Sequence, residues 1–292
     1  MQWNCPQSEC KSSLKSGLVV RFGYFRRACD SRQIQRFLCR GCGHTFSTAT
    51  MHPCYRQHQR RVNYKLLLHL VSGGSLRRAA MLFHLNRKTV YRKLKFLGRL
   101  CRRKHHDYLR QFVSKELRVL QFDEMETFEH TKLKPLSLPL VVTKKREILA
   151  FRVASMPAKG LLSSKSLKKY GPRKDRRAYA MRSMLRAIKP FVSEESLFES
   201  DQNPTYPNLL KEVFPNARHV TTPGGRGCIV GQGELKKLTW DPLFSLNHTA
   251  AMKRANINRL FRRTWCTTKK PRRLIDHLSI YVWYHNTVLL KR

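Results

Sequence analysis

The sequence predicts an α+β chain of several domains, in which a mixed β-sheet flanked by helices follows two small N-terminal units. Three observations support this division. Paired cysteines occupy residues 1–56, apolar residues at helical spacing dominate residues 57–104, and short strand-like and helix-like runs alternate through residues 112–292. These three ranges are the predicted domains.

The charge of the chain favours nucleic acid as its partner. Lys and Arg number 59 against 18 Asp and Glu, which gives a formal net charge of +41. A folded chain this basic repels itself unless a polyanion neutralises it, although ribosomal and membrane-surface proteins are also basic. The first 115 residues hold three acidic residues, whereas five fall between Glu116 and Glu129. This asymmetry predicts an N-terminal part that binds DNA and a later part that binds metal ions.

The first domain contains two cysteine pairs with the spacing of metal ligands. Cys5 and Cys10 form the first pair, and Cys39 and Cys42 form the second, which Gly43 follows directly. A glycine there allows a tight turn whose backbone amides approach the sulfurs. Four thiolates from two such turns make a closed tetrahedral zinc site.

Strand-like runs at residues 18–24 and 35–38 lie between and beside these cysteines, which is the layout of a zinc ribbon. Cys29, Cys54 and His44 are alternative ligands, and buried cysteines without metal are the simpler interpretation. Nine cysteines is an odd number, and metal ligation or free thiols are expected rather than disulfides.

Three helices are predicted in the second domain, over residues 62–71, 75–83 and 87–98, with a charged helical linker over 99–104. Gly73 and Gly74 end the first helix, and Ser75 is a good N-cap for the second. The pattern indicates a helix-turn-helix whose third helix suits the DNA major groove, although a basic three-helix bundle packed on the next domain would look similar. The polar face of the third helix carries Arg87, Lys88, Thr89, Tyr91 and Arg92.

The third domain begins with a strand within residues 117–127, in which Asp123 is expected at the exit of the buried part. Its further elements are strands at 136–143, 147–154, 196–201 and 217–221 and helices at 176–189, 206–213, 250–263 and 271–286. A basic mobile loop that contacts nucleic acid is expected at 157–175, and a glycine-rich loop at 223–233. The order strand-strand-strand-helix-strand-helix-strand fits a ribonuclease-H-like mixed sheet.

In that topology the first and fourth strands are neighbours, which would bring Asp123 and Asp201 together. Carboxylates bind hard cations through oxygen, and two metal ions flank the scissile phosphate in many phosphoryl-transfer sites. Taken singly, each Asp could equally be a solvated residue at the end of a strand.

The chain resembles the transposases of the first-numbered bacterial insertion-sequence family and its relatives. The resemblance rests on the cysteine pairs, the helix-turn-helix, the pair Asp123-Glu124, the Ser-Asp at Asp201, and the run Arg-Leu-Phe-Arg-Arg-Thr-Trp-Cys-Thr-Thr-Lys. Its most specific residues near the C-terminus are Asn247, Arg254, Arg259, Arg262 and Arg263. It implies a ribonuclease-H-like recombinase with three catalytic acids that uses Mg²⁺ or Mn²⁺ and pairs element ends as a homo-oligomer on double-stranded DNA.

The third catalytic acid departs from the family pattern, because Ser245 and Leu246 stand where the family has a Glu. Asp241 is the first candidate, Glu234 the second, and a chain without a functional third acid is the remaining alternative. Asp241 precedes Pro242 at a predicted helix start, and a helix N-cap is its competing role.

Two functions follow from these features. One is DNA transposition, which is DNA recombination by a mobile element through metal-dependent cleavage and strand transfer. The other is a sequence-specific repressor with a degenerate nuclease fold. The sequence has no apolar run of about 18 residues and no secretory signal, so we expect a bacterial cytoplasmic, nucleoid-associated protein without a membrane partner or a small-molecule substrate.

Overall fold

The computed structural model forms two compact units, Met1–Lys65 and Leu66–Arg292. It describes residues 3–10, 17–28, 30–113, 117–223, 241–261 and 264–291. In the described part, no helix is long and apolar enough to cross a membrane.

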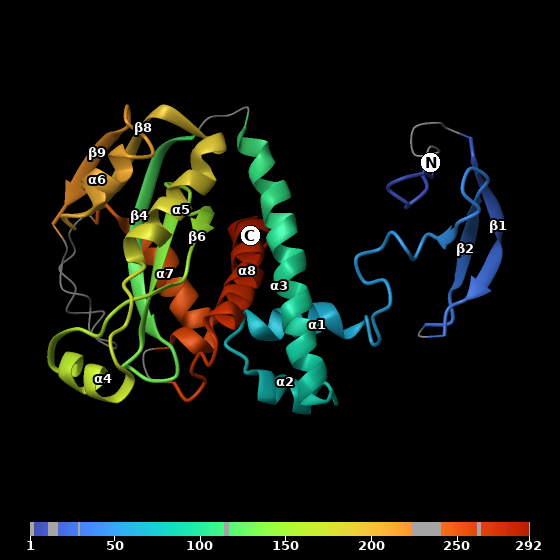
Figure 1. Cartoon of the computed structure of the whole chain (residues 1–292), viewed down its shortest axis with the longest axis horizontal. Helices are drawn as coiled ribbons and strands as arrows, with labels where there is room; N and C mark the ends of the chain where they lie inside the picture. Colours follow the sequence, from blue (N-terminus) through green and yellow to red (C-terminus); the bar gives the residue numbers. More distant parts are fainter. Residues whose placement is uncertain are drawn as a thin grey trace. The chain divides into compact units, whose positions relative to one another are not determined.

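The first unit contains a three-stranded antiparallel sheet (Figure 1), in the order β1 (Val19–Arg26), β2 (Gln33–Cys39) and β3 (Thr45–Ser47). Both predicted strands are confirmed, and β3 was missed because three residues are too few to show alternation. Phe37 and Phe46 stack in the small core, with ring centroids 5.5 Å apart. A core of this size supplies little stability unless a metal ion or another cross-link is present.

Three helices lead into the second unit, as α1 (Val62–Leu70), α2 (Leu76–Leu82) and α3 (Arg87–Leu109). The side chain of Ser75 accepts a hydrogen bond from the Arg78 amide, and Asn86 accepts one from the Lys88 amide, so both N-caps satisfy amides at helix starts. The predicted third helix and linker form one continuous helix, since α3 runs without a break past the linker.

The long helix α3 packs along α8 (Pro271–Thr287), and Figure 1 shows the two side by side. Their backbones approach closely at Gly98, where an added Cβ would lie 2.8 Å from the Asp276 Cα. The Asp276 carboxylate is buried between two guanidinium groups, 3.3 Å from Arg102 Nη2 and 2.7 Å from Arg273 Nη1. This contact joins α3 to the C-terminal helix α8.

The sheet of the second unit is mixed, with the order β6-β5-β4-β8-β9 and β7 paired to β5. Its strands are β4 (Leu117–Phe128), β5 (Pro135–Thr143), β6 (Ile148–Phe151), β7 (Ala154–Ser155), β8 (Val192–Asp201) and β9 (Arg218–Thr222). Strands β4, β5 and β6 form an antiparallel meander, whereas β8 is parallel to both β4 and β9. The predicted meander and the predicted β4–β8 neighbours are confirmed, and the arrangement is consistent with a ribonuclease-H-like core.

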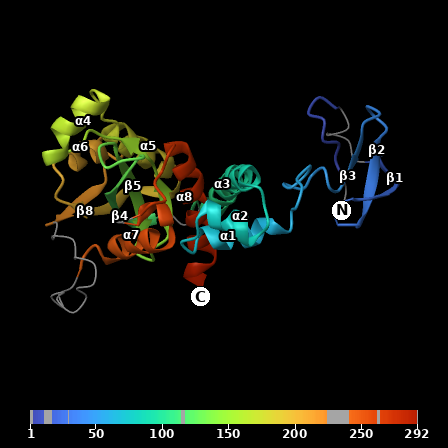
Figure 2. The ribbon, with the colours of Figure 1, turned by 90° about the horizontal axis from the view of Figure 1, so that it is seen from below.

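Helices flank this sheet. They are α4 (Ser163–Tyr170), α5 (Arg177–Ile188), α6 (Tyr206–Lys211) and α7 (Phe244–Asn256). Figure 2 shows α5 and α6 on one side of the sheet and α7 on the other. Phe122 and Phe198 belong to the core beneath α5 and α6, which also includes Met181 and Leu185. Short 3₁₀ turns complete the fold at Arg110–Phe112, Gly160–Leu162, Lys189–Phe191, Asn258–Leu260 and Leu289–Lys291.

Three predictions about this unit are wrong. Strand β4 does not end near Asp123, because β5 pairs with it as far as Phe128. Residues 157–175 are not simply a loop, because α4 forms there and Ser166 anchors it by donating to the Leu133 carbonyl at 2.7 Å. The helix expected over 250–263 instead starts at Phe244 and ends at Asn256. The glycine-rich loop lies almost wholly outside the described residues.

We expect Gly98→Ala to lower the free energy of unfolding, although alanine is the better helix former. The new methyl group would meet the Asp276 backbone, and overpacking of this kind costs about 1–3 kcal/mol. Urea unfolding followed by circular dichroism measures the effect. Arg99→Ala, at an exposed position in the same helix, is the control and should change stability little. Equal stability of Gly98→Ala and wild type would contradict the close approach.

Candidate metal centres and nucleic-acid interface

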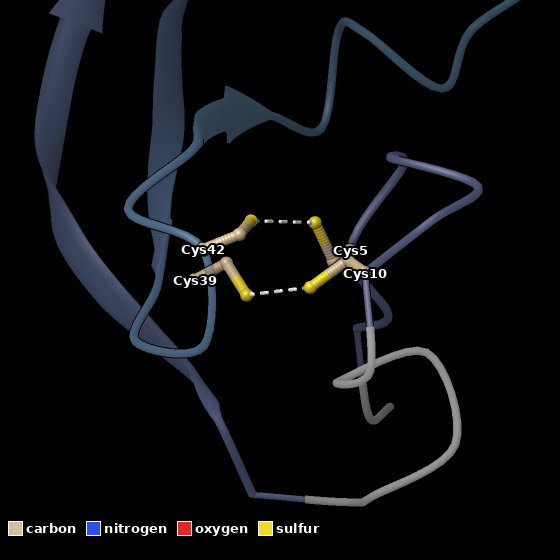
Figure 3. Close-up of side chains that lie close together, drawn as sticks. All are labelled: Cys5, Cys10, Cys39 and Cys42. Carbon is tan, nitrogen blue, oxygen red and sulfur yellow. Dashed lines mark hydrogen bonds between the residues drawn. The ribbon is translucent and has the colours of Figure 1, made fainter.

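Four cysteines of the first unit gather their sulfur atoms in one place (Figure 3). All four Sγ atoms lie within 4.8 Å of one another, and the Cys5–Cys42 and Cys10–Cys39 pairs are each 3.7 Å apart. A tetrahedral ion with zinc–sulfur bonds of about 2.3 Å separates its sulfurs by about 3.8 Å. Disulfide sulfurs would be about 2.05 Å apart. The four cysteines could therefore bind a zinc ion.

The backbone after β2 forms the tight turn that this spacing predicts. Gly43 has φ of 69°, and its amide donates to the Cys39 carbonyl at 2.8 Å, while the Cys39 amide donates to the His44 carbonyl at 2.9 Å. The alternative ligands stay outside the cluster: Cys54 Sγ accepts from Asn63, and His44 is not among the four. Cys29 lies outside the described residues.

The second candidate centre is the pair of aspartates on β4 and β8. These parallel strands are in register at Gln121 and Glu199, the last residues at which they pair. Two positions farther along each strand are Asp123 and Asp201, which the pleat places on the same face as that pair. The pairing of neighbouring parallel strands thus brings the two carboxylates side by side where the strands separate.

Asp123 is held in a largely buried position. Its Oδ1 accepts hydrogen bonds from the Glu124 amide at 2.6 Å and from the Tyr206 hydroxyl at 3.1 Å. Burial raises the pKa of Asp123, and together with the smaller effect of the negative charge of Asp201 it brings this pKa to about 6. Burial and the charge of Asp123 also raise the pKa of Tyr206, so its hydroxyl stays a donor. A divalent cation at this place would offset the charge that destabilises the ionised pair.

The side chains that connect the aspartate site to α7 were not predicted from the sequence. Gln121 is fully buried, and its Nε2 donates to Glu199 Oε2 and to the Pro242 carbonyl, each at 2.7 Å. Its Oε1 accepts from the Leu246 amide at 3.0 Å, and Lys144 forms an ion pair with Glu199. A lone Gln in an apolar strand gave no signal of this role, because its partners are about 80 and 120 residues away.

The structure does not gather Asp241 with the aspartate pair into one ligand set. Within the described residues, the four cysteines are the only group of three or more candidate ligands whose ligand atoms all lie within 4.8 Å of one another. Asp241 Oδ1 accepts from the Leu243 amide and Oδ2 from Asn247 Nδ2, each at 2.9 Å. The bond to the Leu243 amide closes a turn just before α7, whose N-cap is Leu243 without a side-chain cap hydrogen bond, so the competing prediction that Asp241 is the helix N-cap is wrong. Glu234 lies outside the described residues.

The predicted DNA-binding residues fall into two groups. Arg87, Lys88, Tyr91 and Arg92 are exposed at the start of α3, Thr89 is half-buried, and the apolar stripe of the same helix is buried. On the C-terminal side, Arg254 is on α7, whereas Arg259 lies in a 3₁₀ turn where burial lowers the pKa of its guanidinium. Arg262 and Arg263 lie outside the described residues.

We expect the purified chain to contain about one zinc ion, held by the four clustered cysteines. Cys39→Ser should lose the metal and unfold the first unit, since its core is small, and Cys54→Ser should keep both. Elemental analysis and limited proteolysis measure these outcomes. A metal-free protein with a protease-resistant first unit would contradict the assignment.

We expect the stability of the second unit to report the Asp123 pKa. Folding raises this pKa from 3.8 to about 6, so the folded chain keeps a proton that the unfolded chain releases between these values. Stability therefore falls as the pH rises through this window, by on the order of 2–3 kcal/mol.

Asp123→Asn should be more stable than wild type near pH 8 and lose that advantage near pH 4, as urea unfolding at both pH values would show. Millimolar MgCl₂ should stabilise wild type at the higher pH and leave Asp123→Asn unchanged. Glu195→Gln, at an exposed position on β8, is the control. An equal response to MgCl₂ in all three proteins would mean that no cation binds at Asp123.

Comparison with known proteins adds no identification to this geometry. No protein-family model matches the sequence, and a search of curated proteins finds no similar one.

Proposed function

We propose that this chain is a transposase that binds the ends of an insertion sequence and carries out metal-dependent DNA cleavage and strand transfer. The observation that carries the proposal is the placement of Asp123 and Asp201 on neighbouring parallel strands of a mixed sheet. A carboxylate pair is what a two-metal phosphoryl-transfer site requires, and the charge of Asp201 adds to burial in raising the Asp123 pKa.

Asp123 and Asp201 fit a pair of Mg²⁺ or Mn²⁺ ions, because hard cations prefer carboxylate oxygen. Such ions activate water or a DNA 3′-hydroxyl and stabilise the leaving oxygen. In this proposal Tyr206 orients the Asp123 carboxylate by hydrogen bonding, and Gln121 holds the start of α7 against the pair. Asp241 is the proposed third acid, and it would exchange its bonds to Leu243 and Asn247 for a metal ion.

The remaining parts of the chain are assigned to DNA. The first unit is proposed to be a zinc ribbon, and α1 to α3 a helix-turn-helix whose exposed residues Arg87, Lys88, Tyr91 and Arg92 enter the major groove. The net charge of +41 supports this assignment, because DNA phosphates would neutralise it. Transposition joins two element ends, so we propose that the chain acts as a homo-oligomer on double-stranded DNA in the bacterial cytoplasm, at the nucleoid.

A repressor with an inactive nuclease fold is the second candidate function. The hydrogen bonds of Asp241 to Leu243 and Asn247 favour it, since among the described residues no third carboxylate groups with the aspartate pair. Both candidate functions require the basic N-terminal part of the chain for DNA binding. Only the transposase requires the aspartate pair.

We expect Asp123→Asn and Asp201→Asn each to abolish Mg²⁺-dependent cleavage of DNA that carries the flanking element ends. Each should keep or slightly strengthen DNA binding, because a negative charge near phosphate is removed. A cleavage assay and a mobility-shift assay on the same DNA measure the two properties. Asp241→Asn tests the third acid, and Glu195→Gln is the control.

Full cleavage by Asp123→Asn would reject the proposed transposase activity and leave the repressor as the candidate function. Full cleavage by Asp241→Asn would reject only the third acid. Arg87→Ala and Arg92→Ala should weaken binding to element ends more than binding to unrelated DNA, and an equal loss on both would mean that α3 reads no bases.

A further inference from the structure

A hollow of about 580 Å³ lies in the second unit, away from the aspartate pair. Sites for small ligands commonly have volumes of 300–1,000 Å³. Its wall comes from β5, β7, α4 and α5, with Leu136, Ser155, Ser166, Tyr170 and Ser183 among its lining residues. None of the residues predicted to bind metal lines this hollow, although part of its lining falls within residues 157–175, which were predicted to contact nucleic acid.

The lining is strongly cationic. It includes one carboxylate, Glu129, and five cations, Lys134, Arg152, Arg173, Lys174 and Arg176. Arg173 Nη2 lies 3.1 Å from Glu129 Oε2, and among the described residues the other four cations form no ion pair. Four uncompensated positive charges around one hollow repel each other and would be relieved by an anion.

Arg152 is a fixed charge in this wall. Its Nε and Nη2 donate to the hydroxyl and the carbonyl of Ser183, each at 3.0 Å, and its Nη1 donates to the Phe151 carbonyl at 2.9 Å. Burial lowers the pKa of its guanidinium, because removal from water disfavours the charged form. A cation held in this way is already oriented before an anion arrives, so little side-chain entropy is lost on binding.

Arg173 offers a donor that nothing in the described structure accepts. Its Nε is buried without a hydrogen-bond partner, although its Nη2 contacts Glu129. Buried N–H groups almost always have an acceptor, and one left without costs about 1–3 kcal/mol. Arg173 is therefore a cation of the lining whose hydrogen-bonding capacity its contact with Glu129 leaves unsatisfied.

Two aromatic rings stand beside these cations. Lys134 Nζ lies 4.2 Å from the centroid of the Tyr170 ring, and Tyr179 on α5 is 72% exposed. An exposed ring next to bound phosphate is how many proteins hold a nucleotide base, because every base has a face that stacks.

We propose that this hollow binds a nucleotide, with its phosphate held by Arg152, Arg173 and Lys134 and attracted by the charges of Lys174 and Arg176, and with its base stacked on Tyr179. The nucleotide is either free in solution or the unpaired end of a DNA strand, since both present the same phosphate and base. The inference does not depend on DNA cleavage, and loss of the aspartate pair leaves it unchanged.

Calorimetric titration of the full chain with deoxyadenosine monophosphate tests the proposal. We expect saturable binding, competition by inorganic phosphate, and no heat with deoxyadenosine, which lacks the phosphate. Tyr179→Ala and the double variant Lys174→Gln/Arg176→Gln should each weaken binding about 10-fold. All three side chains are exposed, so these variants should fold. Arg173→Gln should abolish binding, and Arg186→Gln, on the far part of α5, should not change it.

A 5′-phosphorylated single-stranded oligonucleotide distinguishes the two sources. Displacement of the mononucleotide by this strand, and not by its unphosphorylated form, would identify a DNA end as the ligand, whereas no displacement would identify a free nucleotide. Absence of mononucleotide binding to wild type, or equal affinity in wild type, Tyr179→Ala and the double variant, would overturn the proposal.

Discussion

The parallel pairing of β4 with β8 is the constraint on which the candidate catalytic site depends. The register that sets Gln121 beside Glu199 also sets Asp123 beside Asp201, at the point where the two strands part. Gln121 then uses both ends of its buried amide to fix Glu199 and the start of α7. A shift of β8 by one residue against β4 would turn Asp201 to the opposite face and Phe198 out of the core that it shares with Phe122, so burial of those rings favours the observed register.

The aspartate pair and the cysteine cluster are two candidate metal centres of different kinds. The cysteines are already at the spacing of a closed tetrahedral site, and their first unit has little core without it. The aspartates instead form an incomplete set with a raised Asp123 pKa, which suits exchangeable ions that arrive with substrate. In our proposal the first centre stabilises a DNA-binding unit, and the second supplies the chemistry.

Much of the architecture could be predicted from sequence because it depends on local pattern. The short apolar runs of β4 and β5, the Ser75 cap and the two cysteine turns each act within a few residues. The wrong predictions concern segments whose structure is determined by contacts with residues far away in the sequence. Strand β4 extends past Asp123 because β5 pairs with it, and α4 is anchored by Ser166 to the Leu133 carbonyl. Gln121, Glu199 and Lys144 gave no signal because their roles exist only after the sheet forms. The position of the third acid could not be derived for the same reason.

The central claim is that Asp123 and Asp201 together bind the catalytic ions. Anomalous diffraction from crystals of the chain with bound DNA and Mn²⁺ tests it most directly. We expect two manganese peaks about 3.5–4 Å apart, which the carboxylates of Asp123 and Asp201 would hold. Manganese bound elsewhere, or no manganese at this pair while DNA is bound, would contradict the account.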